Sequence, residues 1–238
     1  MKEYNLELEG VNIPIHIIIE PRRGYRASFT KKGLNIRLPN YYSIKKREEV
    51  TKNMVDWARE TVIRKPTILN KYDKPEYKTG SVISTFDDQF TIEMLSSKNK
   101  HITGKILGNT IQFFIPETMS ANDVKPGYVS KLLAKEYKHF FSERILFWSN
   151  HFSKQPKQFR LKYNSSNWGS CSSKGNINLS TRLLLCPPQV IDYVIVHELA
   201  HLIHPNHSKS FWQEVKRVMP DFKTHATWLK TKGAHLDF

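Results

Sequence analysis

The sequence predicts an α+β fold in which antiparallel strands come first and a group of helices follows. Apolar and polar residues alternate through much of the first 116 residues, which is the period of a β-strand. From about residue 129 onward most apolar residues recur at helical spacing, between capping and breaking residues. We therefore expect a β-rich N-terminal region with one helix over residues 1–125 and a second domain over residues 126–238.

The N-terminal region is expected to begin with antiparallel strands. Apolar residues alternate in three runs within the first forty residues: Ile13, Ile15, Ile17 and Ile19; Tyr25, Ala27 and Phe29; and Leu34, Ile36 and Leu38, with a turn at 31–33 before the last. A helix follows over 43–64, with Ser43 as its N-cap and Pro66 as its stop. Further strands are expected over 81–94, 105–107 and 110–116, the last two joined by a Gly108-Asn109 hairpin turn.

The second domain is expected to contain a buried helix with another helix packed behind it. A helix over 129–151 provides the backing for a nearly continuous apolar helix over 190–203, which reads as buried. Between them, a strand over 159–163 precedes a hairpin that pairs 168–172 with 177–180. Ser208 caps the first of two final helices, and Gly233 ends the second. The chain contains no internal sequence repeat.

His197, Glu198 and His201 form the pattern HExxH on the apolar helix. Residues four apart lie on the same helical face, so both imidazoles can point at one metal ion. Glu198 is one step round the helix, beside the open coordination position. There its carboxylate can take a proton from a metal-bound water and pass it to a leaving group.

His207 is the expected third ligand. Pro205 and Asn206 break the helix and form a turn, so the chain can fold back toward the metal after His201. His204 is a weaker alternative, because it lies only three residues beyond His201, and a turn or supporting role suits it better. The remaining candidates have ordinary structural interpretations: Cys171 as a buried small residue, Tyr193 in the core rather than catalytic, Glu214 beside the site or at the surface, and His225 and His235 exposed.

Several segments together resemble the YgjP-like metallopeptidase family, over about residues 156–232 and more weakly in the β-rich N-terminal part. They are Trp168-Gly169-Ser170-Cys171, residues 190–194, the segment His197–His201, Asn206-His207-Ser208 and Phe211-Trp212. That family is related to the SprT-like and WLM proteases of DNA–protein crosslink repair, and WLM members also resemble this chain at His204. Metzincins share the histidine spacing but carry glycine at the turn, and the sequence shows no Met-turn.

The resemblance implies a zincin-type fold with one zinc ion per chain, held by His197, His201 and His207, and Glu198 as general base. It implies hydrolysis of peptide bonds in a protein or peptide substrate, with SprT- or WLM-like processing of proteins on DNA as a further possibility. In zincins a strand beside the active-site helix receives extended substrate through backbone hydrogen bonds. The strand over 168–172 is the candidate here, with plain core packing as its alternative.

Composition limits the cellular setting and leaves nucleic acid open as a partner. The 238 residues contain 37 Lys and Arg against 22 Asp and Glu, a net charge of +15, which favours polyanions. The excess is spread along the chain: short clusters such as Arg22-Arg23 and Lys45-Lys46-Arg47 read as solvated surface, and no nucleic-acid-binding motif is present. No run of 18 apolar residues and no signal-peptide core occurs, and two cysteines suit a reducing compartment. We expect a cytoplasmic protein with free thiols at Cys171 and Cys186.

Two other function classes remain open. Proteins resembling the YgjP family have been described as nucleotide pyrophosphatases, and a basic zinc site could bind phosphates. The sequence, however, contains no Gly-rich phosphate loop and no carboxylate cluster for Mg²⁺. The other class is a non-catalytic, zinc-stabilised nucleic-acid-binding module. Structural zinc sites are normally closed by four protein ligands, so a three-histidine site with Glu198 beside it favours catalysis. The oligomeric state stays open.

Overall fold

The computed structural model describes residues 4–8, 11–30, 32–65, 68–69, 72, 76–233 and 236–238. The chain divides into two compact units, Met1–Lys74 and Pro75–Phe238, and each has its own hydrophobic core. This division falls at Lys74 and Pro75, whereas the sequence suggested a boundary between residues 125 and 126. The difference arises because residues 76–125 contribute Phe90, Ile92, Ile111 and Phe113 to the same core as the later helices.

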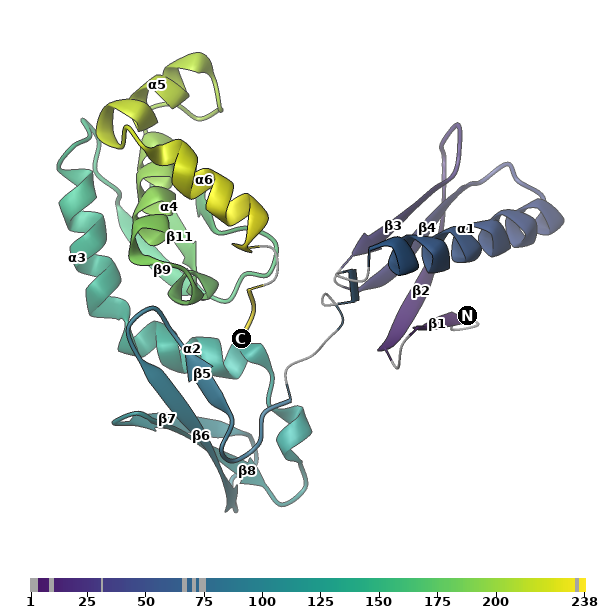
Figure 1. Cartoon of the computed structure of the whole chain (residues 1–238), viewed down its shortest axis with the longest axis horizontal. Helices are drawn as coiled ribbons and strands as arrows, with labels where there is room; N and C mark the ends of the chain where they lie inside the picture. The colour runs from purple at the N-terminus through teal and green to yellow at the C-terminus, as the bar shows by residue number, and fades with distance from the viewer. Residues whose placement is uncertain are drawn as a thin grey trace. The chain divides into compact units, whose positions relative to one another are not determined.

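The smaller unit is a four-stranded sheet with one helix (Figure 1). Its strands are β1 (Tyr4–Leu8), β2 (Val11–Glu20), β3 (Arg26–Thr30) and β4 (Gly33–Pro39), in the order β1-β2-β4-β3. Helix α1 (Ile44–Arg64) packs against β4 and buries Val50, Ala58 and Val62. Ser43 caps it as predicted, since its hydroxyl accepts a hydrogen bond from the backbone N–H of Lys46. Lys31 and Pro66, expected at a turn and a helix stop, lie outside the described residues.

The prediction of purely antiparallel strands in this region was wrong. The β1–β2 and β3–β4 pairs are antiparallel, but β2 and β4 are parallel. Alternation of apolar residues shows which face a side chain occupies, and it does not show which strand lies beside it. Here β3 crosses to the outer edge, and β4 returns between β2 and β3. The alternating isoleucines of β2 are also split: Ile13 and Ile15 are buried, whereas Ile17 and Ile19 are 38% and 49% exposed.

A second sheet with the same arrangement opens the larger unit. Its strands are β5 (Val82–Ser84), β6 (Gln89–Ser97), β7 (Thr103–Leu107) and β8 (Thr110–Pro116), in the order β5-β6-β8-β7. The pairings are again antiparallel, parallel and antiparallel. The predicted hairpin is confirmed, with Gly108 at φ +53° in its two-residue turn. The strand arrangement therefore recurs in both units, although the sequence shows no repeat.

The single helix predicted over 129–151 is two helices, α2 (Pro126–Glu136) and α3 (Lys138–Ser149), preceded by a 3₁₀ turn, η2 (Ala121–Asp123). The helices meet at Tyr137, whose backbone leaves the helical region at φ −88°, ψ 11°. Its hydroxyl is hydrogen-bonded to Asp88 and Thr85, in the turn between β5 and β6. This anchoring of one buried side chain to the sheet redirects the chain, and apolar periodicity alone does not reveal it.

The last part of the chain builds a small sheet and the remaining helices. The strands are β9 (Gln158–Lys162), β10 (Gly169–Cys171) and β11 (Asn176–Ser180), in the order β10-β11-β9. The β10–β11 hairpin is antiparallel as predicted, and β9 pairs with β11 in parallel. A 3₁₀ segment, η3 (Thr181–Leu185), leads to α4 (Pro188–Ala200), α5 (Lys209–Val218) and α6 (Phe222–Thr231).

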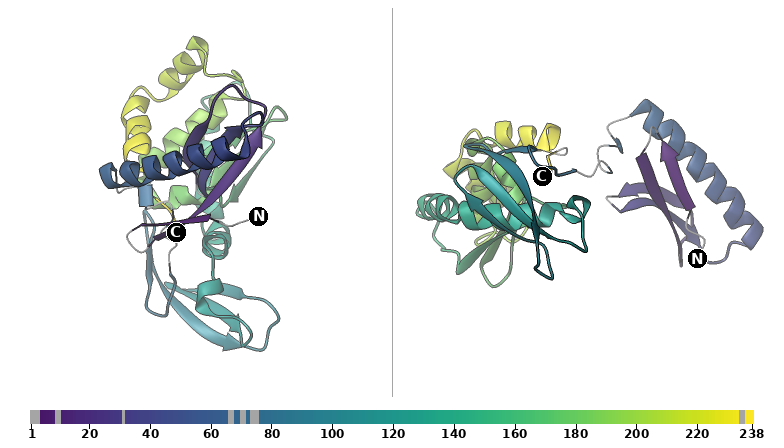
Figure 2. Two further views of the ribbon diagram at one scale, coloured as in Figure 1. Left: turned by 90° about the vertical axis from the view of Figure 1, so that its right-hand side faces the viewer. Right: turned by 90° about the horizontal axis from the view of Figure 1, so that it is seen from below.

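Helix α4 is buried on most sides, as its apolar sequence predicts. It packs against α3, α5, α6, β10 and β11, and ten of its thirteen residues are buried (Figure 1). A bidentate ion pair between Arg144 and Asp192 joins it to α3. Figure 2 shows α5 at one end of the larger unit and the four-stranded sheet at the other. Among the described residues, no helix combines the length and apolarity that crossing a membrane requires.

Candidate metal centre

The chain around α4 places three histidines within a short distance of one another. Pro188 suits the first helical turn because its missing N–H needs no partner there. The helix ends at Ala200, and His201 is its C-terminal cap. Backbone hydrogen bonds from Leu202, Ile203 and His204 close a final turn before Pro205. The following loop brings His207 back beside the end of α4, and Ser208 caps α5 through the N–H of Phe211.

His197, His201 and His207 form a cluster whose ring nitrogens lie within 4.8 Å of one another. Nε2 of His197 and Nε2 of His207 are 3.0 Å apart. Two imidazole nitrogens bound to one tetrahedral zinc at about 2.0–2.1 Å would lie about 3.3 Å apart. The spacing and the donor set, three imidazoles without a carboxylate among them, therefore fit a zinc-type ion.

The charge state of the cluster also suits cation binding. Burial, followed by the neighbouring His201 and His207, lowers the pKa of His197 to about 3. Burial lowers the pKa of His201 as well. Both rings are therefore neutral near pH 7, so each has a lone pair available for a metal ion.

A hydrogen bond at the second ring nitrogen orients His201 but not His197. Nδ1 of His201 lies 3.1 Å from the carbonyl oxygen of His204, to which it can donate, leaving Nε2 for a ligand. Nδ1 of His197 is buried and has no hydrogen-bond partner among the described residues. Metal-binding histidines usually have a partner at the second nitrogen, so His197 departs from that pattern.

Two aromatic residues of α5 cover the cluster. The Phe211 ring is fully buried and lies 4.5–4.9 Å from the rings of all three histidines, measured between centroids. Trp212 stacks on His207 at 5.7 Å and also contacts His197. These rings restrict the orientations of the imidazoles and exclude water from one side.

Glu198 is 5% exposed and lies against the backbone of β10. A Cβ atom added to Gly169 would lie 2.6 Å from Oε1 and 2.7 Å from Cγ of Glu198. Only glycine therefore fits at this position unless the glutamate moves. Burial raises the pKa of Glu198 to about 8, which brings proton exchange into the neutral range. A divalent cation nearby would oppose this shift, because it favours the carboxylate.

Comparison with known protein families identifies the class of protein. The family model described as "YgjP-like, metallopeptidase domain" matches residues 26–232, most of the chain. The chain belongs to this family. A YgjP-like metallopeptidase requires a metal ion, and the three-histidine cluster is a group of described residues that could hold it.

One similar solved structure is the crystal structure of the metallopeptidase zymogen of Pyrococcus abyssi abylysin. It is 26% identical over 38% of the YgjP-like chain and 94% of its own chain, with a TM-score of 0.35. No curated protein sequence matches the chain.

The other candidates from the sequence lie around the cluster without joining it. His204 contributes its backbone carbonyl, as described above. Tyr193 is buried, and its ring contacts His197 and stacks on Phe222, which suits a core residue. Cys171 is half-buried and packs against the core, and burial, followed by the nearby Glu198, raises the pKa of its thiol.

Three further expectations concern residues outside the cluster. Glu214 is paired with Arg217 within α5, and this hydrogen bond lowers the pKa of its carboxyl. The prediction that His225 is exposed was wrong: its side chain is 15% exposed and lies 3.1 Å from Asp221, one helical turn earlier. His235 falls outside the described residues.

Sequence reasoning did not assign roles to Gly169, Phe211 or Trp212 at this site. All three stood in the segments that carry the YgjP-like resemblance, which was the available signal. The contacts themselves depend on how β10 and α5 approach α4, and no local pattern specifies that approach.

Proposed function

We propose that the protein is a zinc-dependent peptidase in which His197, His201 and His207 hold one zinc ion and Glu198 is the general base. The proposal rests on one observation: the imidazoles of His197, His201 and His207 converge, and the buried carboxylate of Glu198, the residue after His197, lies against β10. The family supplies the reaction class, since YgjP-like proteins are metallopeptidases.

When bound, the zinc ion would polarise the substrate carbonyl and make a water molecule more acidic. Glu198 takes a proton from the attacking water and delivers it to the leaving amine nitrogen. The water oxygen joins the carbonyl carbon, the carbon–nitrogen bond breaks, and the products are a carboxylate and an amine. A buried carboxylate is suited to this exchange because its protonated and ionised forms are close in free energy near neutral pH.

We further propose that the substrate lies in extended form along β10. This strand is at one edge of its sheet, so one side of it has no strand neighbour among the described residues. Its inner face already touches Glu198 through Gly169. A peptide paired with the free edge would pass close to the general base, and its backbone hydrogen bonds would be independent of side-chain sequence.

The resemblance to SprT-like and WLM proteases extends the proposal to proteins attached to DNA. Its support is the net charge of +15, which favours recruitment of substrates carried on a polyanion. Faster cleavage of a DNA-bound protein than of the same protein without DNA is the expected result. Equal rates would limit the proposal to a general peptidase.

The proposal as a whole is tested by assaying one preparation for metal content and for two activities. We expect about one zinc ion per chain, cleavage of casein or a peptide library, and no hydrolysis of nucleoside triphosphates. Hydrolysis of nucleoside triphosphates without peptide cleavage would replace the peptidase by a nucleotide hydrolase. Zinc binding without either activity would indicate a structural zinc site.

A further inference from the structure

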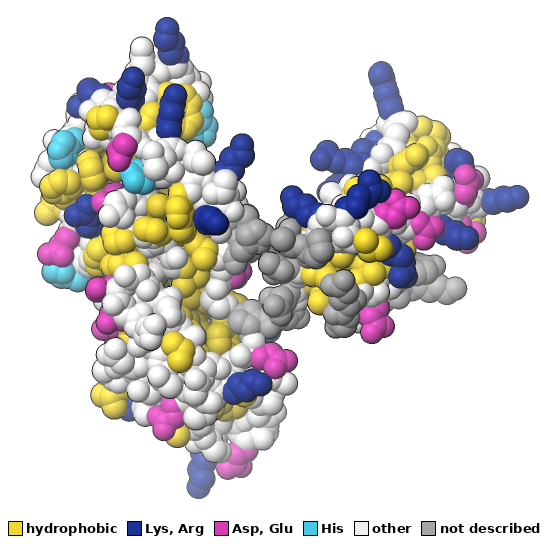
Figure 3. Space-filling model, viewed as in Figure 1, with side chains coloured by type: hydrophobic (Ala, Val, Ile, Leu, Met, Phe, Trp, Pro, Cys, Tyr) yellow, Lys and Arg dark blue, Asp and Glu magenta, His cyan; other side chains and the backbone are white. Residues whose placement is uncertain are grey.

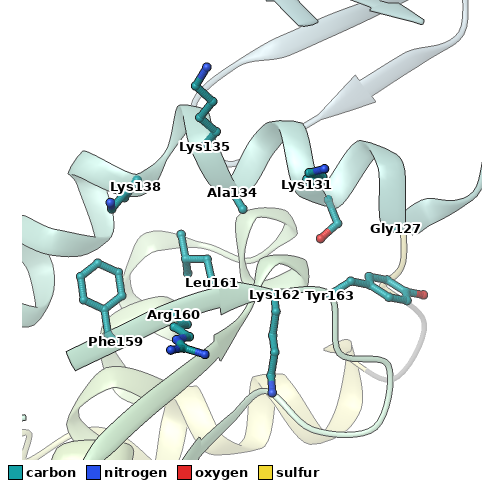
Figure 4. A pocket seen from close by; sticks show the side chains of 11 residues that line it. Gly127, Lys131, Ala134, Lys135, Lys138, Phe159, Arg160, Leu161, Lys162 and Tyr163 are labelled. Carbon is teal, nitrogen blue, oxygen red and sulfur yellow. The ribbon is translucent and has the colours of Figure 1, made fainter. Parts of the chain in front are cut away.

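A groove of about 570 Å³ lies in the larger unit between α2 and β9. Five cationic side chains line it: Lys131 and Lys135 from α2, Lys138 from the start of α3, and Arg160 and Lys162 from β9. We call this the basic groove. Figure 4 shows Phe159 and Leu161 of β9 on the side that faces the helix, so the groove has an apolar interior with cations around it.

The five cations of the basic groove lack partners. All five residues are exposed, and among the described residues none of their charged groups makes an ion pair or a side-chain hydrogen bond. No aspartate or glutamate lines the groove. Like charges gathered without counter-charges repel one another, and a bound anion relieves that repulsion.

Over the larger unit as a whole, basic residues exceed acidic ones much less than they do in the groove. Its 164 residues carry 21 Lys and Arg against 13 Asp and Glu. On the face shown in Figure 3, basic side chains are scattered and acidic ones lie among them. The basic groove is therefore a local concentration of positive charge rather than a sample of the average surface.

Polar side chains extend the groove across the outer face of the small sheet. Arg160 also lines a second hollow together with Gln158, Asn176 and Asn178, which again contains no acidic residue. Arg160 is level with Asn178 and Ser170 across the three strands. Gly169, which touches Glu198, lies on the opposite face, together with Phe159 and Leu161. Strands β9 and β10 are at opposite edges of the sheet, so a ligand that lies along the β9 edge leaves the β10 edge free.

The lining of the groove argues against a peptide as its occupant. A peptide backbone carries no regular series of anionic groups, whereas five cations and no carboxylate line the groove. A flexible chain with anionic groups outside and flat apolar groups inside fits better, because its charges meet the rim and a ring can stack on Phe159.

We propose that the basic groove binds single-stranded nucleic acid, with phosphates at the five cations and a base against Phe159. Backbone phosphates supply the charge, and base–aromatic stacking requires bases that are not paired in a duplex. This inference concerns binding alone and does not depend on the proposed peptidase activity.

The test is fluorescence anisotropy of the full-length protein with a labelled twelve-nucleotide single strand at several salt concentrations. If all five cations meet phosphates, affinity is expected to fall by about a hundred-fold between 50 and 200 mM salt, following a slope near 0.7 per phosphate contact. The triple variant Lys131→Gln, Lys135→Gln, Lys138→Gln should reduce the magnitude of the logarithmic slope by about 2. A matched triple variant, Lys216→Gln, Lys223→Gln, Lys230→Gln, removes the same charge from α5 and α6 and should keep most of the slope.

One further variant and two competitors identify the ligand of the groove. Phe159→Leu, which keeps an apolar side chain but removes the ring, should weaken binding by about five-fold or more without changing the salt slope. A blunt duplex and inorganic polyphosphate of equal charge should compete less well than the single strand. Three results would each overturn the proposal. The first is an equal effect of the two triple variants, and the second is equal binding of duplex and single strand. The third is competition by polyphosphate together with no effect of Phe159→Leu.

Discussion

At the scale of single residues, the site depends on a close approach that only glycine permits. Glu198 is confined between α4 and the backbone of Gly169, so its carboxylate has little room to change position. General-base catalysis requires a fixed distance between the carboxylate and the proton that it removes. Gly169 is therefore a positioning residue: it acts through Glu198 and does not itself need to touch the substrate.

We expect Gly169→Ala to displace Glu198, because the new Cβ would lie 2.6 Å from Oε1. A displacement of about 1 Å can reduce turnover by about 100-fold. Steady-state kinetics should show the loss in kcat with a smaller change in KM, and metal analysis should show unchanged zinc. Gly127→Ala is the matched control, since a Cβ there meets no atom within 4 Å. Unchanged kcat in Gly169→Ala would remove the positioning role.

The third ligand is tested by comparing His207→Ala with His204→Ala. Loss of His207 removes a ring nitrogen from the cluster, so zinc affinity should fall by more than the 10- to 100-fold typical of an outer-shell partner. His204→Ala keeps the backbone carbonyl beside His201 and should retain zinc. Metal titration of both proteins decides between them: retention in His207→Ala with loss in His204→Ala would mean that the ligands were assigned wrongly.

At the scale of elements, α4 is held by packing on several sides and by the ion pair between Arg144 and Asp192. Asp192 is buried, and its carboxylate accepts hydrogen bonds from the Arg144 guanidinium, one of them 2.8 Å long. The same pair raises the pKa of Arg144. The contact fixes α3 against the helix that carries His197 and Glu198.

We predict that Arg144→Leu lowers the free energy of unfolding by about 2 kcal/mol, because it leaves a buried carboxylate without its partner. The double variant Arg144→Leu, Asp192→Leu should recover part of this loss, since both charges are then absent. Urea unfolding followed by tryptophan fluorescence measures both effects; four of the five tryptophans lie in the larger unit. A loss below about 0.5 kcal/mol in the single variant would show that the pair contributes little.

Local patterns predicted those elements whose determinants lie within a few residues. Ser43 and Ser208 cap their helices, Gly108-Asn109 forms a hairpin turn, and α4 is buried because most of its residues are apolar. The parallel pairing of β2 with β4 and the break at Tyr137 were not predictable in this way. Both depend on contacts between segments distant in sequence, such as Tyr137 with Asp88.

The same distinction applies to the site. The three histidines and Glu198 were named from their spacing, and the structure brings the histidines together. Their assignment as ligands and base stays a prediction. The contact between Gly169 and Glu198 and the covering by Phe211 required the structure, because β10 and α5 reach α4 through tertiary packing.

At the scale of the whole molecule, two compact units divide the chain, and all the candidate ligands belong to the larger one. The two units share a strand arrangement, β1-β2-β4-β3 and β5-β6-β8-β7, each followed by a helix. Only the larger unit adds the second sheet and the α4–α6 helices that form the metal centre. The function proposed here therefore resides in the larger unit.

Removal of metal with a chelator is expected to destabilise the larger unit. A ligand bound only to the folded state at a thousand times its Kd stabilises that state by about 4 kcal/mol. Tryptophan fluorescence is well placed to report the change, since Trp212 stacks on His207. Added zinc should restore stability and Mg²⁺ should not, because imidazole ligands favour zinc and Mg²⁺ favours oxygen. An unfolding transition unaffected by chelation of zinc-loaded protein would argue against a bound ion at this site.

If Glu198 is the base of a zinc-dependent peptidase, replacing its carboxylate should abolish most of the activity and spare the metal. Glu198→Gln has nearly the same shape but cannot accept the proton, and Glu198 is not among the proposed ligands. The measurement is peptide hydrolysis by wild-type and Glu198→Gln proteins, each confirmed to hold one zinc ion per chain. We expect a loss of about 10²- to 10⁴-fold in kcat at unchanged zinc content. Wild-type activity in the zinc-loaded variant would contradict it.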